Sequence, residues 1–239
     1  MGSTSLITGT ESGIGPDVAI RLLKEGHSVY ACHYRPLENV EEYYENIQDE
    51  QRFCTAVLDV TNHSRVAEVA SEAIECFGQI HAIINVAGIA YFGDPDNVTI
   101  DEWETTFDVN VHGYFRLIDN LLPNLKKVED SIIINTSSIW GLQGNANMYA
   151  YASSKHAVEG LTKGLQEYAK KNSIKVTSLV LDKVDSNFRS LMEDYVKIPK
   201  EKQKNMLSTS DVSDAVMYIL NTSRTALVST LALDAYQWR

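Results

Sequence analysis

The chain has 239 residues, of which 44% are hydrophobic and 22% charged, as in a globular protein with a large apolar core. Chains of this length in α/β folds commonly form one domain, and no linker, composition shift or repeat divides this sequence, so we expect a single domain over residues 1–239. The formal net charge of −11 argues against a surface for nucleic acid or anionic membrane, because such surfaces cluster Lys and Arg.

Short apolar and β-branched runs, bounded by turn residues, predict about seven strands. Most are apolar at nearly every position, as in Ile132-Ile133-Ile134, which suits strands covered by helices on both faces. The segments between them carry helical periodicity, so the chain predicts a Rossmann-like α/β fold with a doubly wound parallel sheet. The predicted strands are Ser5–Thr8, Ser28–His33, Phe53–Leu58, Ala82–Val86, Ser131–Asn135, Lys175–Leu181 and Leu227–Leu233.

Helix boundaries are signalled by capping residues. Thr61-Asn62-His63 and Asp101 offer N-caps, while Gly26 and Gly78 stand where helices should stop. The basic run Lys197–Lys204 is interrupted by Glu201 and reads as a mobile lid or a loop.

The cysteines Cys32, Cys54 and Cys76 fit no metal or redox spacing and predict reduced core thiols, with no metal site. No stretch approaches the roughly 18 apolar residues of a membrane span, and the N-terminus enters a predicted strand without a leader pattern. We expect a cytoplasmic protein.

A glycine-rich turn lies between the first predicted strand and the first predicted helix. Glycines at this spacing allow a tight turn and close approach to a pyrophosphate, which a helix N-terminus attracts with unpaired N–H groups and its dipole. Pro16 suits the first helical position. We assign the turn to a dinucleotide site formed by Gly9, Thr10, Glu11, Ser12, Gly13, Ile14 and Gly15.

The end of the second predicted strand bears on the choice of cofactor. NAD sites usually carry Asp or Glu there, about 20 residues past the glycines, to bind the ribose 2′-hydroxyl. This chain has Tyr34 and Arg35 instead, and a guanidinium suits a 2′-phosphate, so we expect NADP(H) ahead of NAD(H). Glu11, an acid inside the phosphate loop, opposes this prediction unless it points to solvent.

Tyr151 and Lys155 are four residues apart in a predicted helix and therefore share one face. A nearby ammonium favours the phenolate, and lowering the pKa of Tyr151 by roughly 2 to 3 units would suit it to proton exchange near neutral pH. Thirteen residues before Tyr151, Ser138 follows the fifth predicted strand, where its hydroxyl can bind a reacting oxygen. Ser137 is the alternative to Ser138, whereas Tyr149 lies on a different helix face.

These motifs together resemble the short-chain dehydrogenase/reductase family, in its compact branch. The resemblance spans nearly the whole chain and implies an NAD(P)-dependent oxidoreductase that interconverts a carbonyl compound and its alcohol. It implies that Asp59 and Val60 flank the adenine, and that Asn85, Ala87 and Gly88 line the cofactor cleft. Tyr151 is then the acid/base, Lys155 also holds the nicotinamide ribose, and Ser138 binds the substrate oxygen. For Asn110 the resemblance implies a water-positioning role in a proton relay, with a structural kink as the alternative.

One segment departs from the family pattern. After the sixth strand the family has Pro-Gly and then Thr, whereas this chain reads Leu181-Asp182-Lys183-Val184-Asp185-Ser186. Ser186 can replace the Thr hydroxyl, and the Val184 N–H can still meet the nicotinamide carboxamide. The departure motivates an alternative function, a catalytically weak or inactive dinucleotide sensor or scaffold on the same fold. A nucleotide-sugar epimerase fits less well, since the chain lacks a C-terminal substrate domain.

Loops after the predicted strands supply candidate pocket residues, whose aromatic and apolar character suggests a small, partly hydrophobic ketone or aldehyde substrate. They could equally be core packing. The resemblance implies a homodimer or homotetramer, with Asn110–Leu125 and Tyr151–Tyr168 as interface candidates. The candidate pocket segments are Ala90–Phe92, Ile139–Leu142 and Phe188–Met192.

Overall fold

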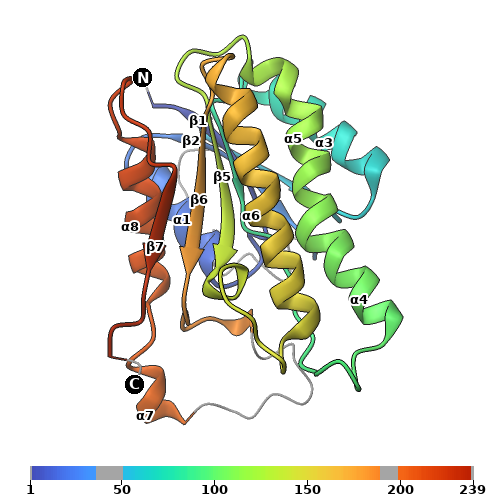
Figure 1. The fold of residues 1–239 in the computed structure, drawn as a ribbon. Helices are drawn as coiled ribbons and strands as arrows, with labels where there is room; N and C mark the ends of the chain where they lie inside the picture. The colour runs from blue at the N-terminus through green and yellow to red at the C-terminus, as the bar shows by residue number, and fades with distance from the viewer. Residues whose placement is uncertain (1, 36–50, 189–198, 238–239) are drawn as a thin grey trace.

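The computed structural model describes residues 2–35, 51–188 and 199–237, and its centre is a parallel sheet. Seven strands pair in the order β3-β2-β1-β4-β5-β6-β7, which confirms the predicted Rossmann-like α/β fold (Figure 1). The strands are β1 Thr4–Thr8, β2 Ser28–His33, β3 Phe53–Val57, β4 Ala82–Asn85, β5 Ile132–Ser138, β6 Lys175–Leu181 and β7 Thr230–Leu233.

The helices form a layer on each face of the sheet. Helices α1 and α8 pack together on one face, and α3, α5 and α6 lie on the other (Figure 1). The helices are α1 Ile14–Lys24, α3 His63–Phe77, α4 Ile100–Phe107, α5 Gly113–Leu125, α6 Tyr149–Lys170, α7 Lys200–Gln203 and α8 Thr209–Leu220, with a π-helical turn η2 Asp108–His112 and a 3₁₀ turn η3 Ile139–Gly141.

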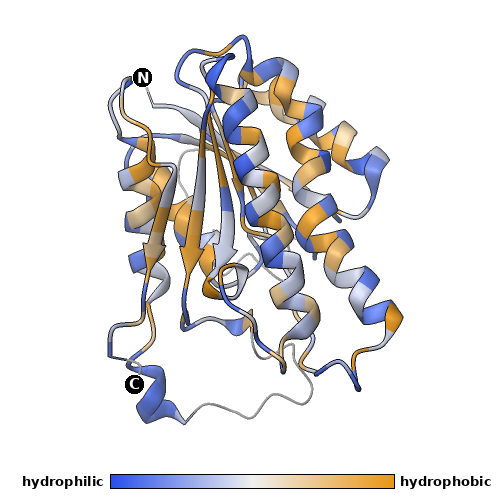
Figure 2. Ribbon diagram, in the orientation of Figure 1, coloured by the Kyte–Doolittle hydropathy of each residue, from blue (hydrophilic) through white to orange (hydrophobic). Residues whose placement is uncertain are grey.

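Strand alternation divides the buried side chains between two apolar clusters. Ile7 packs with Val18 on the side of α1, while its neighbour Leu6 packs with Val66 on the side of α3. Figure 2 shows hydrophobic residues along the central strands and a hydrophilic α7. Both faces of the sheet are therefore buried, as the apolar strand sequences require.

The strand order reverses between β1 and β4, which are neighbours in the sheet but not in the chain. The connections from these strands leave toward opposite faces, so a crevice opens at their carboxyl ends. The fold thus places the glycine-rich turn after β1 beside the segment that follows β4.

Strand β5 is longer than predicted and ends at Ser138 instead of Asn135. The polar sequence Thr136-Ser137-Ser138 resembles a loop when read alone. These residues nevertheless pair in register with Leu179, Val180 and Leu181 of β6, and this tertiary pairing extends the strand.

The helix caps agree with the sequence in part. The Asn62 side chain accepts the N–H of Arg65 at the start of α3, and Gly78 ends that helix with a positive φ of 78°, both as predicted. Asp101 as an N-cap is wrong: Thr99 caps α4 through a reciprocal pair of hydrogen bonds with Glu102.

Two further predictions need correction. Pro16 is the third residue of α1, because the helix already begins at Ile14. Lys200–Gln203 form the short helix α7 and not a loop; residues 197 and 198 of the same basic run lie outside the described residues.

The prediction of three reduced cysteines is wrong for two of them. Cys54 of β3 and Cys76 of α3 form a disulfide, with 22 residues of sequence separation, and only Cys32 is a free, buried thiol. The bond ties α3 to the edge strand of the sheet. Spacing gives no sign of it, because the two sulfurs meet only when α3 packs against β3.

Candidate active site

The glycine-rich turn has the geometry of an anion cradle. Gly9 has a φ of 72°, and a Cβ added there would lie 2.8 Å from Ala87 Cα; one added at Gly15 would lie 2.0 Å from the Gly9 carbonyl oxygen. Gly13 is the N-cap of α1 and gives no side-chain capping bond. The N–H groups of the first turn of α1 therefore face the crevice without a side-chain cap, as a bound phosphate requires.

The end of β4 is held against this turn. Thr8 Oγ1 accepts the backbone N–H groups of Val86 and Ala87, each at 3.2 Å. Asn85 is buried and donates to Asn135 Oδ1 at 2.9 Å across the sheet. Asn85 thus braces neighbouring strands, while Val86, Ala87 and Gly88 line the cleft.

The side chain of Glu11 extends from the glycine-rich turn to the end of β2, where it has a hydrogen-bond partner. Its Oε2 accepts the backbone N–H of Tyr34, the residue before Arg35, at 3.3 Å, so the carboxylate lies at the predicted adenosine corner. Both Tyr34 and Arg35 are exposed there. A carboxylate repels a 2′-phosphate and accepts from a 2′-hydroxyl, so Glu11 and Arg35 act in opposite directions on cofactor choice.

Asp59 and Val60 follow β3 on the same edge of the sheet. Asp59 Oδ1 accepts the backbone N–H of Thr61 at 2.9 Å and its hydroxyl at 2.7 Å. Val60 is buried against Gly113. The two residues thus shape the end of β3, apart from the cleft that contains the Tyr-Lys pair.

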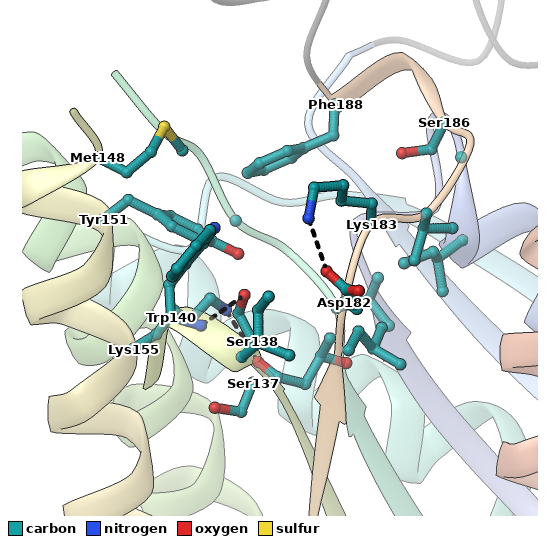
Figure 3. A pocket seen from close by; sticks show the side chains of 18 of the residues that line it. Ser137, Ser138, Trp140, Met148, Tyr151, Lys155, Asp182, Lys183, Ser186 and Phe188 are labelled. Atoms are coloured by element: carbon teal, nitrogen blue, oxygen red, sulfur yellow. Dashed lines mark hydrogen bonds and ion pairs between the residues drawn. The ribbon is translucent and has the colours of Figure 1, made fainter. Parts of the chain in front are cut away.

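Tyr151 and Lys155 lie together on the first two turns of α6. Lys155 Nζ is 5.7 Å from the centre of the Tyr151 ring and donates to the Thr136 carbonyl oxygen at 2.8 Å. In Figure 3 the Tyr151 hydroxyl points into the cleft, toward the side that holds Ser138. Tyr149 instead packs against Trp103, with ring centroids 5.3 Å apart.

Burial lowers the pKa of Lys155 to about 7, against a smaller opposing effect of Glu159. A fully buried ammonium loses hydration, which disfavours its charged form. Tyr114, which the sequence analysis missed, stacks its ring 5.3 Å from the same Nζ and donates its hydroxyl to the Thr136 carbonyl at 3.2 Å. The ammonium therefore lies between two tyrosine rings, which favour its charge.

The two serines at the end of β5 differ in their surroundings. Ser138 Oγ accepts the backbone N–H of Trp140 at 3.3 Å, at the start of η3. Ser137 is packed against Gly141, where an added Cβ would lie 2.8 Å from Ser137 Oγ. In Figure 3 the Ser137 hydroxyl points away from Tyr151, which favours Ser138 as the group nearer the reacting position.

Asn110 lies in the π-helical turn η2 and is fully buried. Its Oδ1 accepts the Ile89 N–H at 2.8 Å, and its Nδ2 donates to the Ile89 carbonyl at 2.9 Å and to Ser154 Oγ at 3.0 Å. The side chain thus joins the helix that contains η2 to the segment after β4 and to α6. The π-helical turn is itself a bulge in the helix, and a structural kink was the alternative role predicted for Asn110.

The cleft has a volume of about 380 Å³ and opens beside the glycine-rich turn. Of the predicted pocket segments, Phe92, Ile139, Trp140 and Phe188 line it; residues 189–192 lie outside the described residues. The described lining also includes Asp182 and Lys183, from the segment that departs from the family pattern, and three residues that were not predicted from the sequence: Asn145, Asn147 and Met148.

The segment after β6 closes the cleft on the side opposite α6. Val184 pairs with Leu207 in a short parallel bridge, and Ser186 Cβ would lie 3.1 Å from a Cβ added at Gly13. Both residues line the cleft, with Ser186 next to the phosphate loop. The loss of Pro-Gly therefore leaves this wall in place.

These features fit a dinucleotide. The turn before α1 accepts no side chain at Gly9 or Gly15, so a phosphate can approach its backbone. Within the described residues, Thr136 Oγ1 on the cleft wall is buried without a hydrogen-bond partner. A buried polar atom of this kind calls for a partner such as a ligand or a water molecule.

Comparisons with known proteins agree with this geometry. Residues 3–195 match the short-chain dehydrogenase family. Uncharacterized oxidoreductases of Staphylococcus saprophyticus and Staphylococcus aureus strain MW2 are each 30% identical over 218 residues, which is 90% of this chain and 90% of each relative.

Solved structures show the same fold. ElxO with NADP bound superposes with a TM-score of 0.88 at 24% identity, covering 99% of both chains. An alcohol dehydrogenase of Thermococcus sibiricus complexed with 5-hydroxy-NADP also gives 0.88, at 23% identity, covering 100% of this chain and 99% of that one.

A dinucleotide-type crevice with a Tyr-Lys pair defines the class of protein as a nicotinamide-dependent oxidoreductase. The chain belongs to the short-chain dehydrogenase family.

No described helix is long and apolar enough to cross a membrane. No cluster of three or more His, Cys, Asp or Glu side chains suited to a metal ion occurs within residues 2–35, 51–188 and 199–237.

Proposed function

We propose that this enzyme interconverts a small, partly hydrophobic ketone or aldehyde and its alcohol, with NADP(H) as cofactor and Tyr151 as the acid/base. The observation that carries the proposal is the buried Lys155 ammonium beside Tyr151, in a cleft that also contains Ser138. Trp140, Met148 and Phe188 supply the apolar walls that suit such a substrate.

In the reductive direction, the Ser138 hydroxyl binds the carbonyl oxygen and turns it toward Tyr151. The bound nicotinamide supplies the hydride. Tyr151 donates its proton to the oxygen as the alcohol forms. The Lys155 ammonium stabilises the tyrosinate that remains and binds the ribose hydroxyls next to the ring.

The cofactor is proposed to lie along the carboxyl edge of the sheet. Asp59 and Val60 border the adenine; Val184 and Ser186 bind the carboxamide side of the nicotinamide. Arg35 pairs with the 2′-phosphate and favours NADP(H), while Glu11 weakens that preference. Asn110 is proposed to support the proton relay by fixing α6 through Ser154.

We also propose a cytoplasmic homodimer or homotetramer. A groove between α5 and α6 carries the half-exposed Phe115 and Tyr168, and an added Cβ at Gly160 or Gly164 meets no atom within 4 Å. Small residues on an apolar helix face let a second copy approach closely. Light scattering of wild type and Phe115→Glu tests this assembly: a monomeric wild type contradicts it.

The test of function measures binding and turnover separately. Titration with NADPH and NADH, followed by a panel of aldehydes and ketones, should show tighter NADPH binding and NADPH-dependent reduction. Ser138→Ala should lower kcat at least tenfold with NADPH binding unchanged, since one donor to the reacting oxygen contributes about 10²- to 10³-fold. Ser137→Ala is the matched control, with a near-normal rate. NADPH binding without turnover of any carbonyl would contradict the enzyme and favour the sensor.

A further inference from the structure

The turn that follows β3 has one hydrogen-bond donor and one acceptor to spare. Within the described residues no group accepts the backbone N–H of Val60. Asp59 bonds Thr61 through Oδ1 alone, so its Oδ2 is left as an acceptor. An N–H close to a carboxylate oxygen complements the edge of adenine, where an accepting ring nitrogen lies next to a donating amino group. The orientation of Val60 therefore bears on how the turn meets the base.

The carbonyl of Val60 is bonded from α5, by Arg116. The Arg116 Nη1 donates to the Val60 carbonyl oxygen at 3.2 Å, and its Nη2 lies 2.6 Å from Asp108 Oδ1. Nη1 is also 3.4 Å from the Asp108 carbonyl oxygen, so one guanidinium joins α5, η2 and the turn after β3. The Arg116 side chain is only 19% exposed, which limits the competition of water for these bonds.

Packing between α5 and the turn leaves this bond with a distinct task. A Cβ added at Gly113 would lie 2.7 Å from Val60 Cγ2, so the Val60 side chain rests against the backbone of α5. That contact fixes the side chain and makes no bond to the main chain. In the part of the chain that the structure describes, Arg116 is the only group that bonds the main chain of Val60.

The contacts of Arg116 separate a positioning role from direct binding of a phosphate. Its cation is already paired with the Asp108 carboxylate, whose Oδ1 also lies 3.1 Å from His112 Nδ1. A planar guanidinium bonds several acceptors in fixed directions, as Arg116 does here with a carboxylate and two carbonyls. Arg116 thus contributes to the geometry of the turn.

From these contacts we propose that Arg116 is a positioning residue for the adenine end of the cofactor site. By fixing the Val60 carbonyl it orients the Val60 N–H and the neighbouring Asp59 carboxylate toward the base, while Asp108 orients the guanidinium. The inference rests on the proposed placement of the cofactor. It adds a group outside that site on which the affinity for adenosine depends.

A fragment of the cofactor tests the adenine end alone. Adenosine 2′,5′-bisphosphate carries the base and the 2′-phosphate without the nicotinamide. Calorimetry should show that Arg116→Met weakens binding of this fragment and of NADPH about three- to tenfold, the range for one net hydrogen bond. In carbonyl reduction the KM for NADPH should rise by a similar factor with kcat unchanged. Arg116→Lys, which keeps the charge and cannot bond all three acceptors at once, should show a smaller loss.

Arg65→Met is the matched control. Arg65 also donates to a carbonyl, that of Val57 at 3.2 Å, and pairs with Glu72 at 2.7 Å. Val57 lies inside β3, where pairing with β2 already holds it in register. Arg65→Met should therefore lower thermal stability as Arg116→Met does, and leave the affinity for the bisphosphate unchanged.

Equal affinity of wild type and Arg116→Met for the bisphosphate, or an equal loss of affinity in Arg65→Met, overturns the positioning role. Should Arg116→Met not fold, Arg116→Lys takes its place in the same comparison. If wild type binds NADPH and the bisphosphate but reduces no carbonyl, the proposed function fails and the comparison of fragment affinities still decides on Arg116. A wild type that binds neither molecule overturns both.

Discussion

Replacing Lys155 with Met should stabilise the protein at neutral pH and make its stability less dependent on pH. Burial lowers the pKa of Lys155 from 10.5 to about 7. At about 1.4 kcal/mol per pKa unit, holding this group in the folded protein costs about 5 kcal/mol at or below pH 7. Loss of the Nζ bond to the Thr136 carbonyl offsets about 2 kcal/mol, so Lys155→Met should gain roughly 3 kcal/mol at pH 7.

The sign follows from proton binding. Because the folded-state pKa lies below the unfolded-state value, the unfolded chain binds more protons between pH 7 and 10.5, and wild-type stability rises with pH in that window. The advantage of Lys155→Met should therefore shrink by about 3 kcal/mol between pH 7 and 9.5.

Urea unfolding of both proteins at the two pH values measures this difference. Lys163→Met, a change at an exposed lysine of the same helix, is the matched control and should show no such trend. A stability difference between wild type and Lys155→Met that stays constant from pH 7 to 9.5 would refute the reasoning.

Three further predictions follow from contacts in and around the site. Tyr114→Leu removes a ring 5.3 Å from Lys155 Nζ, so the midpoint near pH 7 that Lys155 gives to the pH dependence of kcat/KM should fall by about one unit, whereas Tyr114→Phe keeps the ring and should leave that midpoint in place; equal shifts would contradict the cation–π contact. Glu11→Gln should tighten NADPH binding about fivefold in a fluorescence titration and leave NADH binding unchanged or weaker, because a carboxylate no longer faces the 2′-phosphate; unchanged NADPH affinity would place Glu11 outside that corner. Closing a 22-residue loop stabilises by about 3 kcal/mol, so reductant should lower the unfolding free energy of oxidised wild type by that amount and have no effect on Cys54→Ala; a wild type insensitive to reductant would argue against the bond.

The sheet and the reacting pair could be predicted because each leaves a local signal. Ile132-Ile133-Ile134 reads as a strand buried on both faces, and helical spacing alone brings Tyr151 and Lys155 to one side of α6. These inferences need no knowledge of which elements are neighbours in space.

What the sequence did not reveal depends on such neighbours. Tyr114 reaches Lys155 only because α5 packs beside α6. In the sequence, Tyr114 belongs to the apolar stripe of a helix and resembles an ordinary core residue. The Asp182 carboxylate accepts the backbone N–H of Ala235, which comes more than fifty residues later in the chain. Local spacing carries no information about contacts of this kind.

The most direct test of the proposed chemistry compares Tyr151→Phe with wild type in NADPH-dependent aldehyde reduction. This change removes one hydroxyl and keeps the ring that packs against Phe188. If Tyr151 donates the proton, kcat should fall about 10²- to 10⁴-fold while the Kd for NADPH and the unfolding free energy stay near those of wild type. Turnover by Tyr151→Phe within a few-fold of wild type, with cofactor bound equally well, would contradict the assignment.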